Sequence, residues 1–80
     1  MSTVVWSKNN CSYCVSAKAM LDKRGIVYEE RNIEGTKWNT ADYMEANPGA
    51  RSFPQVHIDG KHIGGFDRLQ AHFTLGELTL

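Results

Sequence analysis

The sequence lacks features that would point to two large classes of protein. It carries no net charge, because nine Lys and Arg residues balance nine Asp and Glu residues among its 80 positions. A nucleic-acid-binding domain usually shows a basic patch or stripe, and no run of one sign is present here. No stretch approaches the roughly 20 apolar residues of a membrane-spanning helix. Neither class is therefore favoured.

Cysteine is also scarce: Cys11 and Cys14 are the only two. Residues 1–3 lead directly into an apolar segment, without the basic and hydrophobic regions of a secretory signal, so we expect a cytoplasmic protein. In that reducing compartment, two close cysteines are more often catalytic or metal-binding than a structural disulfide. The composition, 41% hydrophobic and 22% charged, is ordinary for a globular protein. We expect residues 1–80 to form one domain with a thin core.

Hydrophobic periodicity predicts the element order β-α-β-α-β-β-α. The expected strands cover 3–6, 26–31, 55–58 and 61–63, and the expected helices cover 13–24, a segment between 36 and 47, and 66–75. A strand, a helix and a strand within about 30 residues form a unit with parallel strands. Asp59-Gly60 between alternating apolar residues indicates a hairpin. The sequence therefore predicts an α/β fold with a four-stranded mixed sheet flanked by three helices.

Helical spacing also predicts which side chains face inward. In the first helix these are Cys14, Ala17, Met20 and Leu21; in the second, capped by Thr36, they are Trp38, Ala41 and Met44; in the last, they are Leu69, His72 and Phe73. Gly76 is expected to end the last helix. Trp6 is expected in the core and Trp38 at the edge of a groove.

The two cysteines are expected at the N-terminus of the first helix, directly after a buried strand. Unpaired backbone N–H groups and the positive end of the helix dipole lie there, and both favour a thiolate over a thiol. Lys8 adds a cation nearby, unless it is a solvated loop charge. This setting indicates a thiol–disulfide oxidoreductase.

A zinc site is the alternative for these cysteines. Cys11 and Cys14 with His57 and His62 formally give a set of two cysteines and two histidines. The segment between the pairs is far longer than in zinc fingers. His57 and His62 are expected as cross-strand neighbours on a sheet face that need not meet the cysteines. We therefore expect no metal site.

Three motifs together resemble the glutaredoxin family. Cys11-Ser12-Tyr13-Cys14 resembles its Cys-Pro-Tyr-Cys site, residues 52–56 (Ser-Phe-Pro-Gln-Val) resemble its Thr-Val-Pro-Gln-Ile segment, and residues 62–67 (His-Ile-Gly-Gly-Phe-Asp) resemble its His-Ile-Gly-Gly-x-Asp turn. The motifs come in the family's order and spacing. The resemblance runs from about residue 3 to residue 75 and suits a short bacterial- or phage-type dithiol member.

The resemblance implies a thioredoxin fold and glutathione-dependent reduction of protein–glutathione mixed disulfides and protein disulfides. Cys11 would be the nucleophile and Cys14 the resolving thiol, with Lys8 lowering the pKa of Cys11. Pro54 would follow a cis bond. The glutathione-binding residues would be Lys8, Tyr13, Phe53, Pro54, Gly65, Phe66 and Asp67. Tyr13 is alternatively a solvent-facing aromatic, Phe66 a core anchor and Asp67 a helix cap.

Three departures from the family pattern leave other functions open. Ser12 replaces the usual proline, Ala41 stands where Arg or Gln is usual, and Arg68 stands where a second acid is common. One alternative is a redoxin recharged by thioredoxin reductase that serves ribonucleotide reductase. Another is an iron–sulfur cluster carrier, in which two chains and two glutathiones hold the cluster through Cys11. Otherwise the chain is expected to be a monomer.

Overall fold

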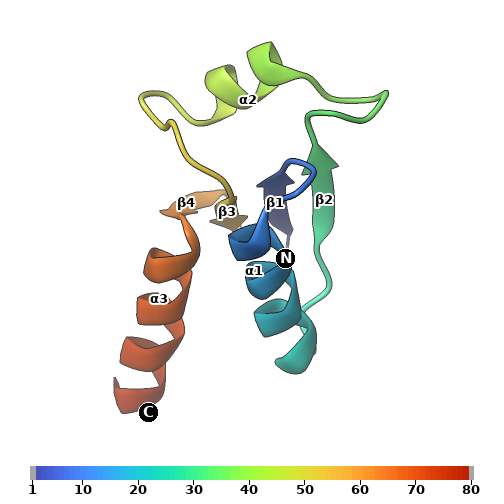
Figure 1. Ribbon diagram of the computed structural model, residues 1–80. Coiled ribbons are helices and arrows are strands. Elements are labelled where there is room, and N and C mark those ends of the chain that lie inside the picture. Colours follow the sequence, from blue (N-terminus) through green and yellow to red (C-terminus); the bar gives the residue numbers. More distant parts are fainter. Residues whose placement is uncertain (1, 80) are drawn as a thin grey trace.

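The computed structural model describes residues 2–79, and its elements follow the predicted order (Figure 1). They are β1 (Thr3–Ser7), α1 (Ser12–Lys23), β2 (Glu29–Asn32), α2 (Thr40–Ala46), β3 (Gln55–Ile58), β4 (Lys61–Gly64) and α3 (Phe66–Thr79). No helix within residues 2–79 is long and apolar enough to cross a lipid bilayer.

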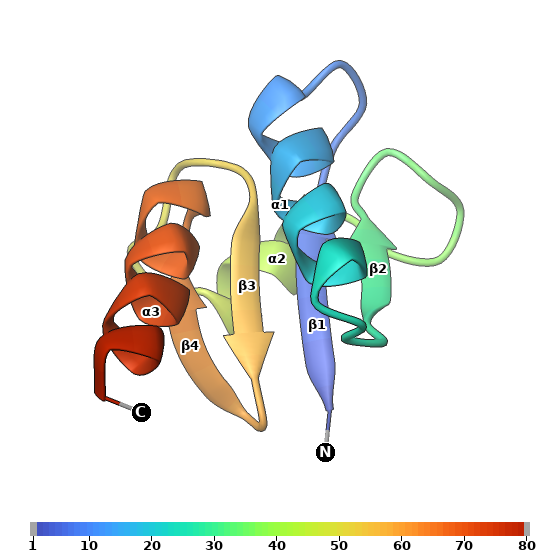
Figure 2. The ribbon, with the colours of Figure 1, turned by 90° about the horizontal axis from the view of Figure 1, so that it is seen from below.

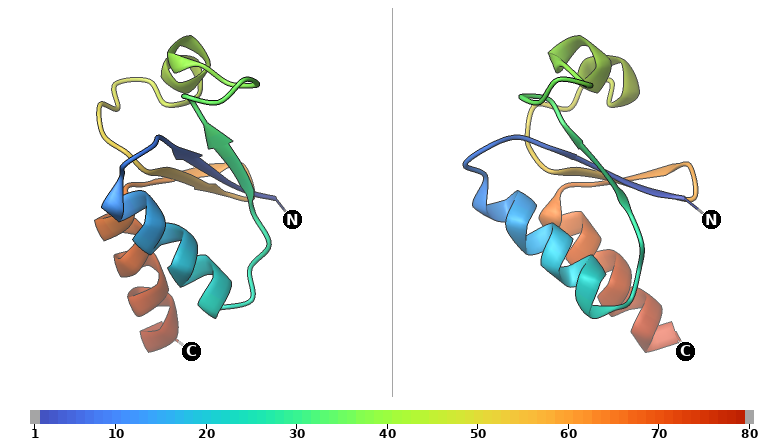
Figure 3. Two further views of the ribbon diagram at one scale, coloured as in Figure 1. Left: turned by 45° about the vertical axis from the view of Figure 1, so that its right-hand side comes forward. Right: turned by 90° about the vertical axis from the view of Figure 1, so that its right-hand side faces the viewer.

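The four strands form one mixed sheet in the order β2-β1-β3-β4. β1 pairs parallel with β2 and antiparallel with β3, and β3 pairs antiparallel with β4. Helices α1 and α3 cover one face of the sheet, and α2 lies across the other (Figure 3). The predicted fold class, a four-stranded mixed sheet flanked by three helices, is confirmed.

The hydrophobic core lies between the sheet and the pair α1 and α3. Val5 of β1 and Val56 of β3 meet Ala17 and Leu21 of α1 and Leu69 of α3, and all five side chains are fully buried. Alternate residues of a strand share one face of the sheet, and helix residues three or four positions apart share one side of the helix. The spacing of these residues therefore turns them all toward the core. The inward stripe predicted for α1 is therefore correct.

The predicted hairpin is present between β3 and β4. Asp59 and Gly60 both have positive φ, 52° and 79°, as the two-residue turn between twisted antiparallel strands requires. His57 lies opposite His62, and their rings stack with centroids 4.6 Å apart. The expected cross-strand histidine pair is therefore confirmed.

The second helix differs from the prediction. It begins at Thr40, and its N-cap is Asn39 rather than Thr36, because the Asn39 side chain accepts the Asp42 N–H while the Asp42 carboxylate accepts the Asn39 N–H. The side of α2 that faces the sheet is also different: Tyr43 is buried, whereas Met44 is 61% exposed and Ala41 is exposed too. The predicted inward face is therefore wrong for Ala41 and Met44, whereas Trp38 precedes the helix and is half-buried, with its ring edge-on to Trp6 at 5.4 Å.

Two element ends also differ from the prediction. β2 begins at Glu29 rather than at Ile26, because the Ile26 N–H bonds to the Leu21 carbonyl and so closes the end of α1. α3 continues through Gly76 to Thr79. His72, expected to pack inward, is exposed, although its ring meets Phe73 edge-on at 5.5 Å.

Candidate active site

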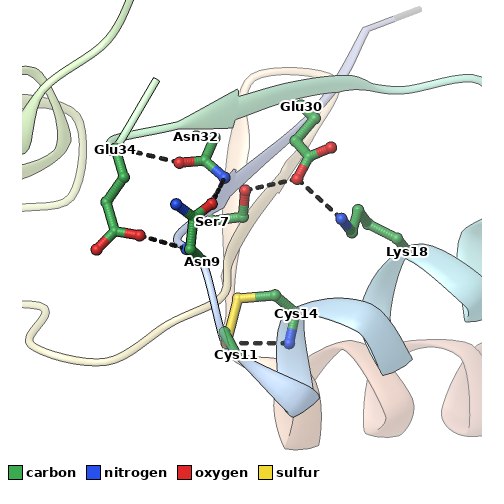
Figure 4. A network of polar contacts seen from close by, with 8 residues as sticks. All are labelled: Ser7, Asn9, Cys11, Cys14, Lys18, Glu30, Asn32 and Glu34. Atoms are coloured by element: carbon green, nitrogen blue, oxygen red, sulfur yellow. Dashed lines mark hydrogen bonds and ion pairs between the residues drawn. A yellow bond between two sulfur atoms is a disulfide. The ribbon is translucent and has the colours of Figure 1, made fainter. Parts of the chain in front are cut away.

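The two cysteines form a disulfide at the start of α1 (Figure 4). Cys11 is the N-cap residue, in extended conformation, and its Sγ accepts the Cys14 N–H at 3.2 Å. Cys11 is half-buried, whereas Cys14 is 1% exposed and faces the core. The sulfur of Cys11 therefore occupies the place where a helix stabilises an anion, and it is the more accessible of the two.

A network of polar side chains fixes the loop that leads to Cys11. The Asn9 N–H donates to the Glu34 carboxylate at 2.7 Å, the Asn32 amide donates to the Asn9 side-chain oxygen at 3.1 Å, and the Glu34 N–H donates to the Asn32 side-chain oxygen at 2.8 Å (Figure 4). Asn10, with φ of 56°, then turns the chain into α1. Asparagine tolerates this left-handed conformation better than most residues.

A hollow of about 590 Å³ lies on the β2 side of the disulfide. Its lining residues are Lys8, Asn9, Asn10, Cys11, Ser12, Cys14, Val15, Lys18, Glu30 and Asn32. The Glu30 carboxylate accepts hydrogen bonds from Lys18 at 2.9 Å and Ser7 at 2.7 Å. The Lys18 hydrogen bond, with that of Ser7, lowers the pKa of Glu30 against the opposing effect of its burial.

A groove of about 350 Å³ borders the other side of the site. Its lining residues are Tyr13, Ser52, Phe53, Gly65, Phe66 and Asp67. The Tyr13 and Phe66 rings stack with centroids 5.9 Å apart. Residues from three separate parts of the sequence therefore meet beside the cysteine pair.

Most of the residues predicted to bind glutathione line this groove. Tyr13, Phe53, Gly65, Phe66 and Asp67 all belong to it. Pro54 is buried next to them, and the Phe53-Pro54 bond is cis, as the resemblance implies. Lys8 lies in the hollow on the other side of Cys11, but its Nζ is 5.5 Å from the centroid of the Phe53 ring. Phe66 also packs against the core, so it both lines the groove and anchors the core.

The segment at the floor of the groove is held by residues that sequence reasoning missed. The Tyr43 hydroxyl donates to the Ser52 carbonyl at 2.7 Å, and the Gln55 amide donates to the same carbonyl at 3.1 Å. The Tyr43 ring stacks on Phe53 with centroids 4.3 Å apart. The one available signal was Gln55, a polar residue at the start of β3.

His57 and His62 lie on the α2 side of the sheet, where their rings contact Asn47 and Gln55. Asn47 uses its amide N–H₂ to bond the Tyr43 carbonyl, so its oxygen accepts from His57 Nε2 at 2.7 Å. His62 Nε2 lies 2.7 Å from the Gln55 oxygen. Burial, the neighbouring His62 and the Arg31 charge lower the pKa of His57. Among residues 2–76, whose side chains the structure describes, no group of three or more His, Cys, Asp or Glu could hold a metal ion.

Comparison with known proteins decides the family. The glutaredoxin family model matches residues 3–63, and this range contains the cysteine pair and the cis-proline segment. The chain belongs to the glutaredoxin family. It is 34% identical over 67 residues to glutaredoxin 1 of Rickettsia prowazekii, covering 82% of this chain and 70% of the relative. It is 36% identical over 67 residues to glutaredoxin 3 of Escherichia coli K12, covering 84% and 80%.

Solved structures of glutaredoxins share the fold. A buckwheat glutaredoxin–glutathione complex superposes with a TM-score of 0.80 at 32% identity, covering 96% of this chain and 72% of that one. The similarity to glutaredoxins confirms the thioredoxin fold that the motifs imply. Family membership and the Cys11–Cys14 pair together support thiol–disulfide oxidoreductase chemistry.

Proposed function

We propose that the protein is a glutathione-dependent reductase of protein–glutathione mixed disulfides and protein disulfides in the cytoplasm. The observation that carries the proposal is the position of Cys11. Its half-buried sulfur caps α1, is bonded to the buried Cys14, and lies beside a groove lined by Phe53 and Asp67. An ionised sulfur next to a peptide-sized groove is what attack on a glutathione disulfide needs.

The exchange begins from the reduced form. The Cys11 thiolate attacks the glutathione sulfur of a mixed disulfide, and the protein sulfur leaves as a thiolate and takes a proton from solvent. A second glutathione thiolate then attacks the glutathione sulfur bound to Cys11. Glutathione disulfide forms, and Cys11 leaves as a thiolate, so one disulfide is reduced for each one formed.

A protein disulfide would use both cysteines. Cys11 forms a mixed disulfide with the substrate, and Cys14 then attacks Cys11 Sγ. The substrate leaves with two thiols, and the Cys11–Cys14 disulfide seen in the structure forms. Two glutathiones reduce that disulfide and complete the cycle. Couples of this kind lie near the potential of the cytosolic glutathione pool, so both directions are accessible.

The groove offers complementary groups for the γ-glutamyl end and for the backbone of the glutathione molecule. The helical hydrogen bonds of α3 begin with the Leu69 N–H, which bonds the Gly65 carbonyl at 2.9 Å, and the Arg68 N–H bonds the Asp67 carboxylate. The Phe66 and Asp67 N–H groups come before the first of these bonds, so they have no acceptor within the helix. They therefore suit the γ-glutamyl carboxylate as donors. The Asp67 carboxylate suits the γ-glutamyl ammonium. The Phe53 backbone would pair with the glutathione backbone.

The related buckwheat protein supports glutathione as the ligand, because its structure is that of a glutaredoxin–glutathione complex. Lys8, at the rim between the hollow and Phe53, suits two roles: a cation for the Cys11 thiolate and a partner for the glycine carboxylate. The contact between the Lys8 ammonium and the Phe53 ring favours a position of the ammonium on the active-site side of the loop.

The test is an NADPH-coupled assay with glutathione, glutathione reductase and a mixed disulfide of glutathione with a small thiol. We expect Cys11→Ser to abolish turnover. Cys14→Ser should retain part of the activity on the mixed disulfide and lose reduction of protein disulfides. Activity that persists in Cys11→Ser contradicts the proposed nucleophile. Replacing glutathione and its reductase by thioredoxin reductase tests the alternative electron donor, and rapid turnover with that enzyme alone would favour it.

A further inference from the structure

A chain of polar contacts links the histidine pair to the segment that borders the groove. Gln55 and His57 are two positions apart in β3, so they share one face of the sheet. His62 of β4 stacks on His57 with an angle of 7° between the ring planes. In Figure 2, α2 lies behind β1 and β3, while α1 and α3 lie in front. The contacts therefore run along the face of the sheet opposite the cysteines.

The Gln55 side chain has one orientation that suits its surroundings. It is 5% exposed, and its amide nitrogen donates to the Ser52 carbonyl at 3.1 Å. A flipped amide would turn its oxygen toward that carbonyl oxygen, which is repulsive. The amide oxygen therefore faces His62, whose Nε2 lies 2.7 Å away. Because an amide oxygen can only accept, His62 donates through Nε2–H, and without this donor a nearly buried acceptor would be unpaired.

The position of the His62 ring is itself fixed by the stack. His62 is exposed, so its ring would rotate about the side-chain bonds unless a neighbour held it. His57 is half-buried, and its Nε2 donates to the oxygen of Asn47, which is fully buried at the end of α2. The His57 ring is therefore a fixed surface for the His62 ring, and the stack directs His62 Nε2 toward Gln55.

The contacts converge on the Ser52 carbonyl. Tyr43 and Gln55 both donate to it, so both of its lone pairs are engaged. The carbonyl and the Phe53 N–H belong to one planar trans peptide unit, in which they point in opposite directions. Holding the carbonyl therefore also fixes the direction of the Phe53 N–H. Among the described residues, none accepts a hydrogen bond from this N–H, and Phe53 lines the groove.

We propose that His62 is a positioning residue for glutathione binding. Through Gln55 it holds the peptide unit between Ser52 and Phe53 in the orientation that presents the Phe53 N–H to the backbone of a bound glutathione. The inference rests on the proposed reductase function and adds to it a residue on the face of the sheet opposite Cys11. Loss of the His62 donor should weaken glutathione binding and leave the exchange chemistry at Cys11 nearly unchanged.

The test compares two substitutions of His62 that differ in one hydrogen bond. His62→Phe keeps a ring that can stack on His57 but has no donor, whereas His62→Gln offers an amide N–H₂ near the position of Nε2. In the NADPH-coupled assay with the small mixed disulfide, we expect His62→Phe to raise KM about two- to tenfold and to change kcat less than about twofold. His62→Gln should restore most of the KM. His72→Phe, the same change at an exposed histidine of α3, should alter neither constant.

A direct binding measurement separates affinity from turnover. S-methylglutathione cannot form a disulfide, so it reports on the groove alone. When it is titrated into the reduced protein and followed by NMR, its Kd should rise in His62→Phe by the same factor as KM. His62→Gln and His72→Phe should bind it nearly as the unmodified protein does.

A double-mutant cycle assigns the effect to Gln55. Gln55→Met has a similar size and no amide, so it should raise KM by itself. If His62 acts through Gln55, adding His62→Phe to this variant should change KM by less than about twofold. If the two substitutions instead multiply their separate effects, His62 does not act through Gln55 and the inference is overturned.

Hydrogen exchange of two side-chain amides gives a spectroscopic readout. The Gln55 amide protons should be protected in the unmodified protein and should exchange severalfold faster in His62→Phe. The Asn47 amide is the internal control, because its nitrogen donates to the Tyr43 carbonyl at 2.8 Å and its oxygen is held by His57. It should keep its protection in His62→Phe. Unchanged exchange at Gln55 would contradict the proposed contact.

The outcomes distinguish this inference from the function on which it rests. If the unmodified protein turns over the mixed disulfide but His62→Phe has the same KM and Kd, the inference is wrong and the function stands. An equal rise of KM in His62→Phe and His62→Gln would also overturn it, because the donor would then not matter. If the unmodified protein neither turns over the mixed disulfide nor binds S-methylglutathione, the proposed function fails, and the inference fails with it.

Discussion

The Tyr43 hydroxyl donates a 2.7 Å hydrogen bond to the Ser52 carbonyl, while its ring stacks on Phe53. One buried residue of α2 therefore holds both the backbone and the side chain of the segment that borders the groove. Gln55 bonds the same carbonyl from the other side of the cis-proline. The groove is thus positioned from the face of the sheet opposite the cysteines.

Replacement of Tyr43 by Phe should loosen that segment. The ring remains, but the Ser52 carbonyl loses its shortest hydrogen bond. We expect the free energy of unfolding to fall by about 1 kcal/mol and KM for the mixed disulfide to rise severalfold, with a smaller change in kcat. Urea denaturation and the coupled assay measure these quantities. Tyr28→Phe, at a half-buried tyrosine packed elsewhere on the core, is the control. Equal KM values for both variants would contradict a role for the hydrogen bond.

His57 should make stability depend on pH. Burial and neighbouring charges hold its pKa below the ordinary value of 6.5, so the unfolded chain binds more protons than the folded chain below that pH. The free energy of unfolding should therefore decrease as the pH falls from about 7 through the folded-state pKa. His57→Gln should flatten this slope, whereas His72→Gln, at an exposed histidine, should preserve it. If the free energy of unfolding depends on pH equally in the two variants, groups other than His57 cause the dependence.

Two glycines of the α3 region should respond to alanine in opposite directions. Gly64 has φ of 124°, and a Cβ there would lie 3.0 Å from Arg68 Cγ and 3.1 Å from Arg68 Cβ. Gly64→Ala should destabilise the protein by about 1–3 kcal/mol. Gly76 lies inside α3, and a Cβ there would meet nothing within 4 Å apart from its chain neighbours and the backbone of its own helix, so Gly76→Ala should stabilise by about 0.5–1 kcal/mol. Chemical denaturation gives both values, and a stable Gly64→Ala would contradict the backbone requirement at the mouth of the groove.

Local signals predicted the parts of the fold that depend on neighbouring residues. Asp59-Gly60 specifies its turn directly, and the stripe that contains Ala17 and Leu21 specifies the inward face of α1. The predicted start of the second helix is wrong because its capping box uses Asn39 and Asp42, a weaker pattern than Ser or Thr followed by Glu. The predicted helix end at Gly76 is wrong because glycine is unfavourable inside a helix but not excluded from it.

The site was predictable where one motif carries it and unpredictable where distant residues cooperate. The cysteine pair and the residues of the groove followed from three short motifs. The bond from Tyr43 to Ser52 joins residues of different elements, and the bond from His62 to Gln55 depends on the hairpin register. No sequence period encodes such contacts, so they emerge only when the elements are packed together.

The central claim is that the Cys11 sulfur of the reduced protein is ionised and accessible at neutral pH. The most direct measurement is the rate of alkylation across pH 4–10 in Cys14→Ser, where Cys11 is the one remaining thiol. We expect a thiolate fraction that rises with a pKa well below that of a free cysteine, and a higher pKa after Lys8→Gln. A profile that follows free cysteine, with a pKa of about 8.5, would contradict it.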